Sequence, residues 1–341
     1  MSAPPPSSSR PTGGTLDHLF FSLKQASRIL AAVSGGPDSV ALMHLLARWR
    51  AESSAPPVIV ATVDHGLRPQ SAEEADFVAR EAASLGLPHR TLVWTGAKPQ
   101  TGVQEAAREA RYRLLAECAR ETGASHLVTA HTLDDQAETV LMRMARGSGL
   151  TGLAGMRRER DREGIRHVRP LLDCPKAKLL ALCEREGWRF VSDPSNRDER
   201  FARVRWRRLM PALAQEGLTA ERLARLAERL TQADEALDAK AREALALAGM
   251  EQEGEGSAFD GRRLAREPFE IALRMLAQAL ARTGPGLDAT RLHRLEACAG
   301  RLREAAAAGR SLRLTIAGAL IGLDRSGRLL IRPEPSRRRG R

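Results

Sequence analysis

The chain has 341 residues, which at about 150 residues per domain leaves room for two domains and excludes a single small module. Lys and Arg number 54 against 42 Asp and Glu, a net charge of +12, so polyanions such as nucleic acid or an anionic membrane surface are the expected partners. With 43% hydrophobic residues the chain is expected to fold, whereas 4% aromatics argue against a platform that stacks single-stranded bases. Only five of the basic residues are lysines, a bias that suits phosphate contacts but also follows from an Arg-rich genome.

The cysteines and the N-terminus bear on the compartment. The four cysteines are scattered without a C-x-x-C pair, which argues against a zinc knuckle and a disulfide framework. The first residues contain no apolar stretch typical of a signal peptide, and no run of about 18 apolar residues occurs. We therefore expect a cytoplasmic protein without a membrane partner.

Residues 28–130 alternate between short apolar runs and helical patterns. Strands are expected at 29–33, 58–63, 90–94 and 126–130, and helices at 38–50, 71–85 and 103–122. Such alternation is typical of βαβ units and a parallel sheet. The sequence predicts an α/β domain with a doubly wound parallel sheet over residues 25–215, preceded by a disordered Pro/Ser-rich tail at 1–24.

The composition changes after about residue 200. Leucines at helical spacing predict a linker helix over 216–250, followed by an acidic, Gly-rich linker at 250–256. Further helices and a hairpin are expected at 268–282, 288–308 and 312–331. They predict a small α+β C-terminal domain at 257–333, which we expect to bind RNA. Residues 334–341 are expected to form a solvated basic tail that is a candidate RNA contact.

The hexapeptide Ser34-Gly35-Gly36-Pro37-Asp38-Ser39 joins the first predicted strand to the first helix. Two glycines let the backbone turn tightly, and amides at a helix N-terminus favour an anion, so we interpret the loop as a phosphate cradle. It is not a Walker A loop, because that motif's lysine is missing and Asp38 stands in the loop. A carboxylate beside phosphates makes sense mainly when Mg²⁺ lies between them. The alternative is an ordinary turn in which Asp38 or Ser39 caps the helix.

This hexapeptide resembles the signature of the pyrophosphate-loop ATPases, which cleave ATP between the α- and β-phosphates and transfer AMP to an oxygen atom. The resemblance implies an adenine nucleotide alpha hydrolase-like fold. It also implies adenylation rather than transfer of the γ-phosphoryl group.

Polar residues near the second strand and on the third helix are expected to face the same crevice. Asp64 and His65 directly follow the second strand, where a doubly wound sheet places its ligand. Arg108 and Arg111 are three positions apart on the third helix, so both can reach that crevice.

The segment after the fourth strand carries a second acidic group. Asp134 and Asp135 follow His131, and adjacent carboxylates are costly to hold together without a cation, which again fits a metal ion. His65 and His131 are candidate general bases. The alternative is that each histidine holds a loop by hydrogen bonding at a strand end.

Taken in order, these blocks closely resemble the tRNA(Ile)-lysidine synthase family, as do the segments 146–156, 169–172 and 193–196. The resemblance runs from about 28 to 211 and points to the short form with one compact C-terminal domain. It implies a ligase that uses ATP and Mg²⁺ to join free L-lysine to C2 of the wobble cytidine in the CAU anticodon of tRNA(Ile), through an adenylated cytidine. The modified base pairs with A, which changes the tRNA from methionine to isoleucine identity. Because this family often forms dimers, a homodimer is an expectation as well.

The resemblance also implies roles for individual residues. The implied catalytic residues are Asp38, Asp134, Asp135 and Arg205, of which Asp38 and Asp134 hold Mg²⁺. The implied ATP-binding residues are Ser34, Gly35, Gly36, Pro37, Asp38, Ser39, Asp64, His65 and His131. The residues implied for substrate or tRNA are Arg108, Arg111, Arg146, Gly149, Arg203 and Arg207. The chain departs from the family pattern at Thr132, where the family usually has a histidine. The basic run 203–211 also lacks the family's asparagine, so the resemblance there extends to the positive charge of the run and not to each residue.

Several alternatives remain beside this interpretation. The arginine-dense stretches 157–169 and 197–208, each with six arginines, grip the tRNA backbone or are solvated faces. A tRNA cytidine thiolase with an iron-sulfur cluster is less favoured, because it needs closely paired cysteines and the sequence has none. An amidating ligase is less favoured as well, because it needs an amidotransferase domain and the stretch before Ser34 is too short for one. A tRNA-binding module without catalysis would leave Asp38, Asp134 and Asp135 dispensable.

Overall fold

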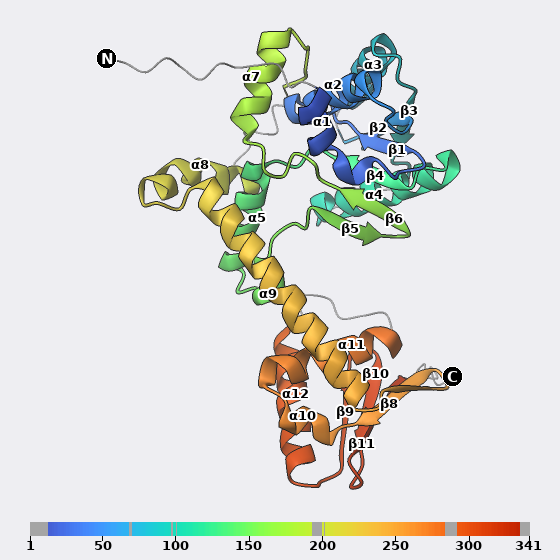
Figure 1. Cartoon of the computed structure of the whole chain (residues 1–341), viewed down its shortest axis with the longest axis vertical. Coiled ribbons are helices and arrows are strands. Elements are labelled where there is room, and N and C mark those ends of the chain that lie inside the picture. The colour runs from blue at the N-terminus through green and yellow to red at the C-terminus, as the bar shows by residue number, and fades with distance from the viewer. Residues whose placement is uncertain are drawn as a thin grey trace. The chain divides into compact units, whose positions relative to one another are not determined.

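The protein is described here by a computed structural model, which covers residues 13–67, 70–96, 98–99, 101–192, 200, 202–283 and 292–334 (Figure 1). The chain divides into two compact units. The first contains Met1–Arg146 and Gly155–Leu226, and the second contains Gly147–Ala154 and Ala227–Arg341. Within the ranges described, no helix has the length and apolar character needed to cross a membrane.

The first unit is built on a six-stranded sheet with the order β3-β2-β1-β4-β6-β5. The strands are β1 Ile29–Ala32, β2 Val58–Asp64, β3 His89–Val93, β4 His126–Thr129, β5 Glu159–Arg162 and β6 Ile165–Val168. Every neighbouring pair is parallel except β5 with β6. Strand β1 therefore lies between β2 and β4, and the predicted doubly wound sheet is confirmed, with its switch point beside β1.

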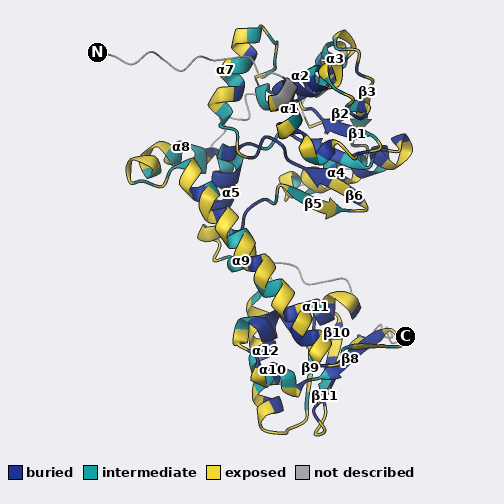
Figure 2. Ribbon diagram, viewed as in Figure 1, coloured by how far each residue is buried: buried dark blue, intermediate teal, exposed yellow. Residues whose placement is uncertain are grey.

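Helices cover both faces of this sheet. They are α1 Gly13–Leu19, α2 Pro37–Glu52, α3 Ser71–Ser84, α4 Val103–Thr122, α5 Leu133–Ala145, α7 Lys176–Glu186 and α8 Ala202–Gln215, with a 3-10 turn at Phe21–Leu23. Buried side chains of α1, α2, α3 and α7 share one core, whereas those of α4 form another core with the opposite face. Within the first unit, many buried residues lie in β1, β2 and β4 and in α2 (Figure 2). The apolar side chains of these central strands are covered by helices on both faces.

The disordered tail predicted at 1–24 is too long. Leu16, Phe20 and Leu23 are fully buried against α2, and the Trp49 indole donates to Asp17 Oδ1 at 2.7 Å. Residues 13–24 therefore belong to the folded unit, because their apolar side chains complete its core. Residues 1–12 lie outside the described residues.

The second unit packs helices on an antiparallel sheet with the order β7-β8-β11-β10-β9. Its strands are β7 Glu251–Glu253, β8 Gly256–Asp260, β9 Leu312–Ile316, β10 Ala319–Leu323 and β11 Arg328–Pro333. Its helices are α6 Leu150–Leu153, α10 Arg262–Arg266, α11 Phe269–Thr283, α12 Leu292–Ala307 and the larger part of α9 Ala220–Leu247. The prediction of a linker at 250–256 is wrong, because this stretch forms the β7–β8 hairpin around Gly254, whose φ is +60°.

Candidate active site

The Ser34–Ser39 loop leaves the first amides of α2 without a side-chain cap. Gly36 is the N-cap residue, and as a glycine it has no side chain that could accept a hydrogen bond from the first amides of the helix. The Ser39 hydroxyl donates instead to the Gly36 carbonyl at 2.9 Å and accepts the Ser34 amide at 3.2 Å. Gly35 has a φ of +86°, a conformation that favours glycine, and its carbonyl accepts the Val191 amide at 2.8 Å. The helix-capping alternative for Asp38 and Ser39 is therefore wrong, and the exposed amides can bind an anion.

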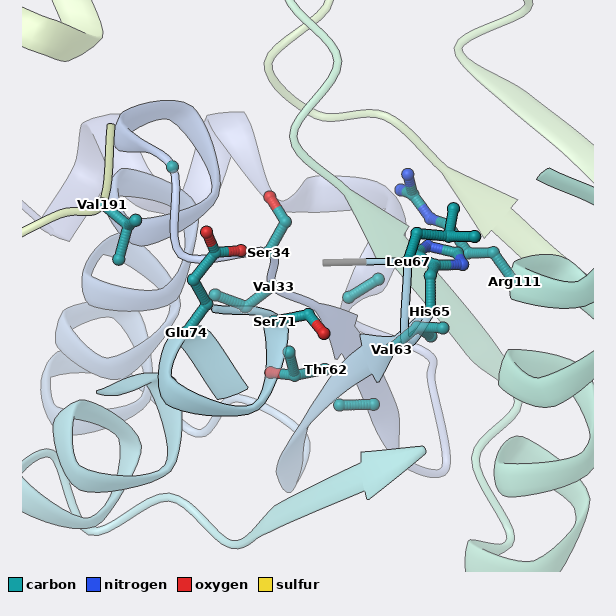
Figure 3. A pocket seen from close by; sticks show the side chains of 13 residues that line it. Val33, Ser34, Thr62, Val63, His65, Leu67, Ser71, Glu74, Arg111 and Val191 are labelled. Carbon is teal, nitrogen blue, oxygen red and sulfur yellow. The ribbon is translucent and has the colours of Figure 1, made fainter. Parts of the chain in front are cut away.

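A cavity of about 340 Å³ opens beside this loop, at the carboxyl ends of β1 and β2. Figure 3 shows His65 and Arg111 together on one side and Ser34 and Glu74 on the other. The volume lies in the range of small-molecule sites. Burial, with Arg111 and Lys98, lowers the pKa of His65, although Asp64 opposes the shift. The cavity therefore presents a neutral imidazole and a guanidinium beside the phosphate loop.

Asp38 and Asp134 meet at Lys176, the first residue of α7. Lys176 Nζ lies 2.9 Å from Asp38 Oδ2, and the Lys176 backbone amide donates to Asp134 Oδ2 at 2.7 Å. Burial raises the pKa of Asp38, and Asp135 and Asp134 add to the rise, whereas Lys176 lowers it. Asp38 Oδ1 is buried without a hydrogen-bond partner among the described residues. This acidic pair therefore has capacity for another cation.

Asp135 has a different role from its neighbour. Its Oδ2 accepts the Thr132 amide at 2.9 Å, while the Asp135 amide donates to the Thr132 hydroxyl at 3.3 Å. The two residues form a capping box at the start of α5. Thr132, the position that departs from the family pattern, is thus the N-cap residue of this helix.

His131 ends a chain of hydrogen bonds through the sheet. The Arg169 guanidinium lies 3.1 Å from His167 Nδ1, and Thr129 Oγ1 lies 2.8 Å from His167 Nε2 and 2.7 Å from His131 Nδ1. An arginine can only donate, so His167 Nδ1 accepts and His167 Nε2–H donates to Thr129. Among the described residues, the buried Thr129 hydroxyl then has His131 Nδ1 as its acceptor. His131 is left with its proton on Nε2, which makes it a hydrogen-bond donor rather than a general base.

A group of arginines surrounds Tyr112 on α4. The guanidinium carbons of Arg162, Arg108 and Arg111 lie 3.8, 5.2 and 5.7 Å from the centre of the Tyr112 ring. Burial raises the pKa of Tyr112, but these arginines and Arg169 outweigh it, so that the net shift is downward. Burial, and then Arg111, Arg169 and Arg203, hold the pKa of His131 well below its ordinary value. A concentrated positive potential therefore stands beside His131.

The arginines of α8 differ in their contacts. Arg207 Nε lies 2.8 Å from Oε1 of Glu138, and Arg207 Nη2 lies 3.3 Å from Glu138 Oε2. Because Glu138 is 1% exposed, this ion pair neutralises a buried carboxylate on α5. Burial is the main cause of the lowered pKa of Arg108 and of His131, and the positive charge of Arg203 lowers both further. The exposed Arg205 donates to the Arg200 carbonyl at 3.0 Å.

Asp64, Arg146 and Gly149, which were also predicted as site residues, lie outside the group of arginines around Tyr112. Asp64 Oδ1 accepts the Gly66 amide at 2.7 Å and so holds the turn after β2. Arg146 is exposed at the end of α5, and Gly149 belongs to the second unit. The segment 193–196 lies outside the described residues.

Sequence reasoning missed Lys176, Thr129, His167 and Glu138. Each of them has a partner far away in the chain, at separations of 38 to 138 residues, so local spacing alone does not report these contacts. Lys176 did carry one signal, because it is one of only five lysines and closely follows the segment 169–172.

The residues fit a magnesium ion that arrives with phosphates. Across the described part of the chain, no three His, Cys, Asp or Glu side chains form a preformed metal site. Mg²⁺ commonly takes one or two carboxylates and completes its shell with water and substrate phosphates. Asp38, with its unpartnered oxygen, and Asp134 fit that pattern.

Comparison with known proteins agrees with this geometry. A family model described as a PP-loop domain matches residues 12–213. The fold is similar to that of the U34-tRNA thiolase NcsA from Methanococcus maripaludis, with a TM-score of 0.55 and 18% identity over 64% of this chain and 78% of that one. Fold and site thus define a PP-loop enzyme that uses ATP.

Curated relatives narrow the class. The tRNA(Ile)-lysidine synthase of Methylobacterium nodulans is 57% identical over 92% of this chain and 93% of its own length. That of Methylobacterium sp. strain 4-46 is 55% identical over 92% of this chain and 91% of its own. The chain belongs to the tRNA(Ile)-lysidine synthase family and is a PP-loop ATP-dependent ligase.

Proposed function

We propose that this enzyme ligates free L-lysine to C2 of the wobble cytidine in the CAU anticodon of tRNA(Ile), in two steps that consume ATP. The observation that carries the proposal is the buried, unpartnered Oδ1 of Asp38 in an uncapped PP-loop of the described chain, which is 57% identical to a tRNA(Ile)-lysidine synthase. In the first step the cytosine O2 attacks the α-phosphorus, an O–P bond forms, and pyrophosphate leaves. In the second the lysine ε-amine attacks C2, the C2–O bond breaks, AMP leaves with that oxygen, and the amine loses a proton.

The loop and its acidic neighbours would hold the nucleotide. The uncapped amides of α2 would bind phosphate oxygens, and the cavity beside Ser34 would take the remainder of the ATP. Asp38 and Asp134 would hold Mg²⁺, which supplies positive charge that stabilises the leaving pyrophosphate.

The arginine group would serve the reacting base. Arg108 and Arg111 provide charge for the pentavalent phosphorus, and the Nε2–H of His131 provides a fixed donor. The cytidine has to leave the anticodon stack to reach them. Arg203 and the arginine-dense stretches would contact the surrounding phosphates.

A labelling assay tests the proposal. The purified full chain is incubated with a CAU-anticodon tRNA(Ile) transcript, ATP and labelled lysine, and label that enters the RNA only with ATP is the expected result. Sulfur incorporated from a sulfur donor would point to a thiolase, and tRNA binding without any incorporation would point to a binding module.

The Asp38→Asn variant tests the role of this carboxylate in the reaction. We expect it to abolish both pyrophosphate release and lysine incorporation, because the amide keeps the shape but loses the charge beside the phosphates. Pyrophosphate is measured by a coupled assay and lysine by label in the tRNA. Full activity of Asp38→Asn would contradict the assigned role.

A further inference from the structure

Lys176 joins the two acidic positions of the site through two different atoms. Its Nζ lies 2.9 Å from Asp38 Oδ2, and its backbone amide donates to Asp134 Oδ2 at 2.7 Å. Because β1 and β4 are neighbouring parallel strands, both carboxylates stand at the same edge of the sheet. The ammonium group therefore occupies the place where positive charge beside Asp38 is needed.

The charge at this point is not balanced by Lys176 alone. Burial raises the pKa of Asp38, and Asp135 and Asp134 raise it further. The Arg207 guanidinium, which is paired with Glu138, also interacts with Asp135 and Asp38. Four carboxylates therefore stand against two cations. Asp38 is 15% exposed at its side chain, and its Oδ1 has no partner in the described part of the chain. A buried carboxylate group with excess negative charge attracts further cations.

The backbone around Lys176 is held without help from its ammonium group. The Leu133 amide donates to the Cys174 carbonyl at 3.0 Å, and the Cys183 thiol lies 3.5 Å from the Pro37 carbonyl. The Lys176 side chain itself is 37% exposed, so its ammonium can move without unpacking α7. The side chain is thus free to change partner while the helix stays in place.

We propose that Lys176 is a built-in counter-ion of Asp38, which neutralises this carboxylate in the nucleotide-free enzyme and turns to the phosphate oxygens when ATP and a divalent cation bind. The inference rests on the proposed ATP site and adds a residue to it. Its consequence is competition, because the ammonium and a divalent cation both require Asp38.

Metal binding without nucleotide tests this competition. Mn²⁺ binding to the full chain is measured by electron paramagnetic resonance, without ATP, lysine or tRNA. Replacing the ammonium in Lys176→Met removes a competing and repelling charge, so Mn²⁺ should bind about tenfold more tightly. The matched control is Lys178→Met, an exposed lysine on the same helix, which should leave the affinity as in wild type.

Two further variants make the result decisive. Adding Asp38→Asn to Lys176→Met should remove the gain in Mn²⁺ affinity, and Lys176→Arg, which keeps the charge, should bind Mn²⁺ as weakly as wild type. If Lys176→Met does not fold by circular dichroism, Lys176→Gln takes its place. Equal Mn²⁺ affinity in wild type and the neutral variants would overturn the proposal.

The nucleotide side gives a second measurement. Once it has left Asp38, Lys176 contacts the phosphates, so Lys176→Met should bind ATP with Mg²⁺ about tenfold more weakly, measured by calorimetry. Unchanged ATP affinity would also overturn the proposal. Neither measurement involves lysidine formation. If the wild type forms no lysidine but Lys176→Met still changes both affinities, the proposed function is refuted and the counter-ion role of Lys176 stands.

Discussion

His131 presents a fixed hydrogen to the site because three residues behind it determine its tautomer. Arg169 donates to His167, His167 donates to Thr129, and Thr129 donates to His131. Burial, together with Arg169 and His131, lowers the pKa of His167 to about 2. A protonated His167 would have no acceptor for its Nδ1 hydrogen, since Arg169 occupies that direction.

This shift predicts how stability depends on pH. Unfolded His167 takes up a proton near pH 6.5, whereas the folded residue stays neutral, so its contribution is lost as pH falls below about 6.5. Between pH 7 and pH 5 one such histidine accounts for about 2 kcal/mol of lost unfolding free energy. In His167→Gln the loss over this range should shrink by about that amount, as measured by guanidinium denaturation at both values. An identical pH dependence in the variant would show that His167 takes up its proton at the same pH in the folded and the unfolded chain, and would contradict the lowered pKa.

At the level of single elements, the capping box of α5 explains why two adjacent aspartates differ. Asp134 receives the Lys176 amide, whereas Asp135 is bound to Thr132 at the N-terminus of the helix. Both were expected to serve the chemistry. The sequence could not separate them, because the box signature has Glu or Gln at the position of Asp135.

Loss of this cap should lower stability. Thr132→Ala removes the hydroxyl that accepts the Asp135 amide, so we expect the unfolding free energy to fall by about 1–2 kcal/mol. Thr132→Ser keeps the hydroxyl and is the matched control. The measurement is urea denaturation, and equal stability of the alanine and serine variants would speak against the box.

Regular elements were predicted well where the hydrophobic pattern was strong. The helix expected at 103–122 is α4 with the same bounds, and the core strands β1, β2 and β4 differ from expectation by a residue or two. The β5–β6 hairpin was missed, because β5 at the edge of the sheet consists of four charged residues and the short β6 has only two aliphatic residues. Likewise the loop and its carboxylates were found from local sequence, whereas Lys176 was not, since only the folded chain brings it to Asp38.

For the whole molecule, the segment Gly147–Ala154 lies in the second unit although its neighbours in sequence lie in the first. Thr151 Oγ1 donates to Asp234 Oδ1 at 2.6 Å, and Arg274 binds the same carboxylate at 2.8 Å. Arg274 also contacts Asp238 and Glu270, at 2.5 and 2.8 Å. One buried guanidinium therefore organises three carboxylates and this segment.

Removing that cation should destabilise the second unit. Arg274→Met removes the guanidinium that lies 2.8 Å from Asp234, a carboxylate that is 1% exposed, so we expect a loss of about 3–5 kcal/mol. Hydrogen exchange should localise the loss to residues 227–283. Arg262→Met, which breaks an exposed pair with Asp260, is the control and should change exchange little. Equal exchange in both variants would contradict the role of Arg274.

The net charge of +12 predicts a salt-dependent encounter with tRNA. If Arg203 contacts a phosphate, Arg203→Ala should reduce the slope of log affinity against log salt by about 1. Lys240→Ala is the control, because this exposed ammonium lies outside the arginine-dense stretches and already pairs with Glu243 at 3.1 Å. Filter binding between 50 and 300 mM salt, roughly the range over which such slopes are read, measures both. The same slope for Arg203→Ala and wild type would place Arg203 away from the RNA.

The ion pair between Asp38 and Lys176 also has a consequence during synthesis. Asp38 leaves the ribosome long before Lys176 is made, since at about 5–20 residues per second the intervening chain takes roughly 7–28 s to translate. Throughout that interval the loop lacks its ammonium partner, and β1 still lacks β4 on one side. A nascent chain that stops before α7 should therefore be open to proteolysis and should gain protection only after Lys176 has emerged.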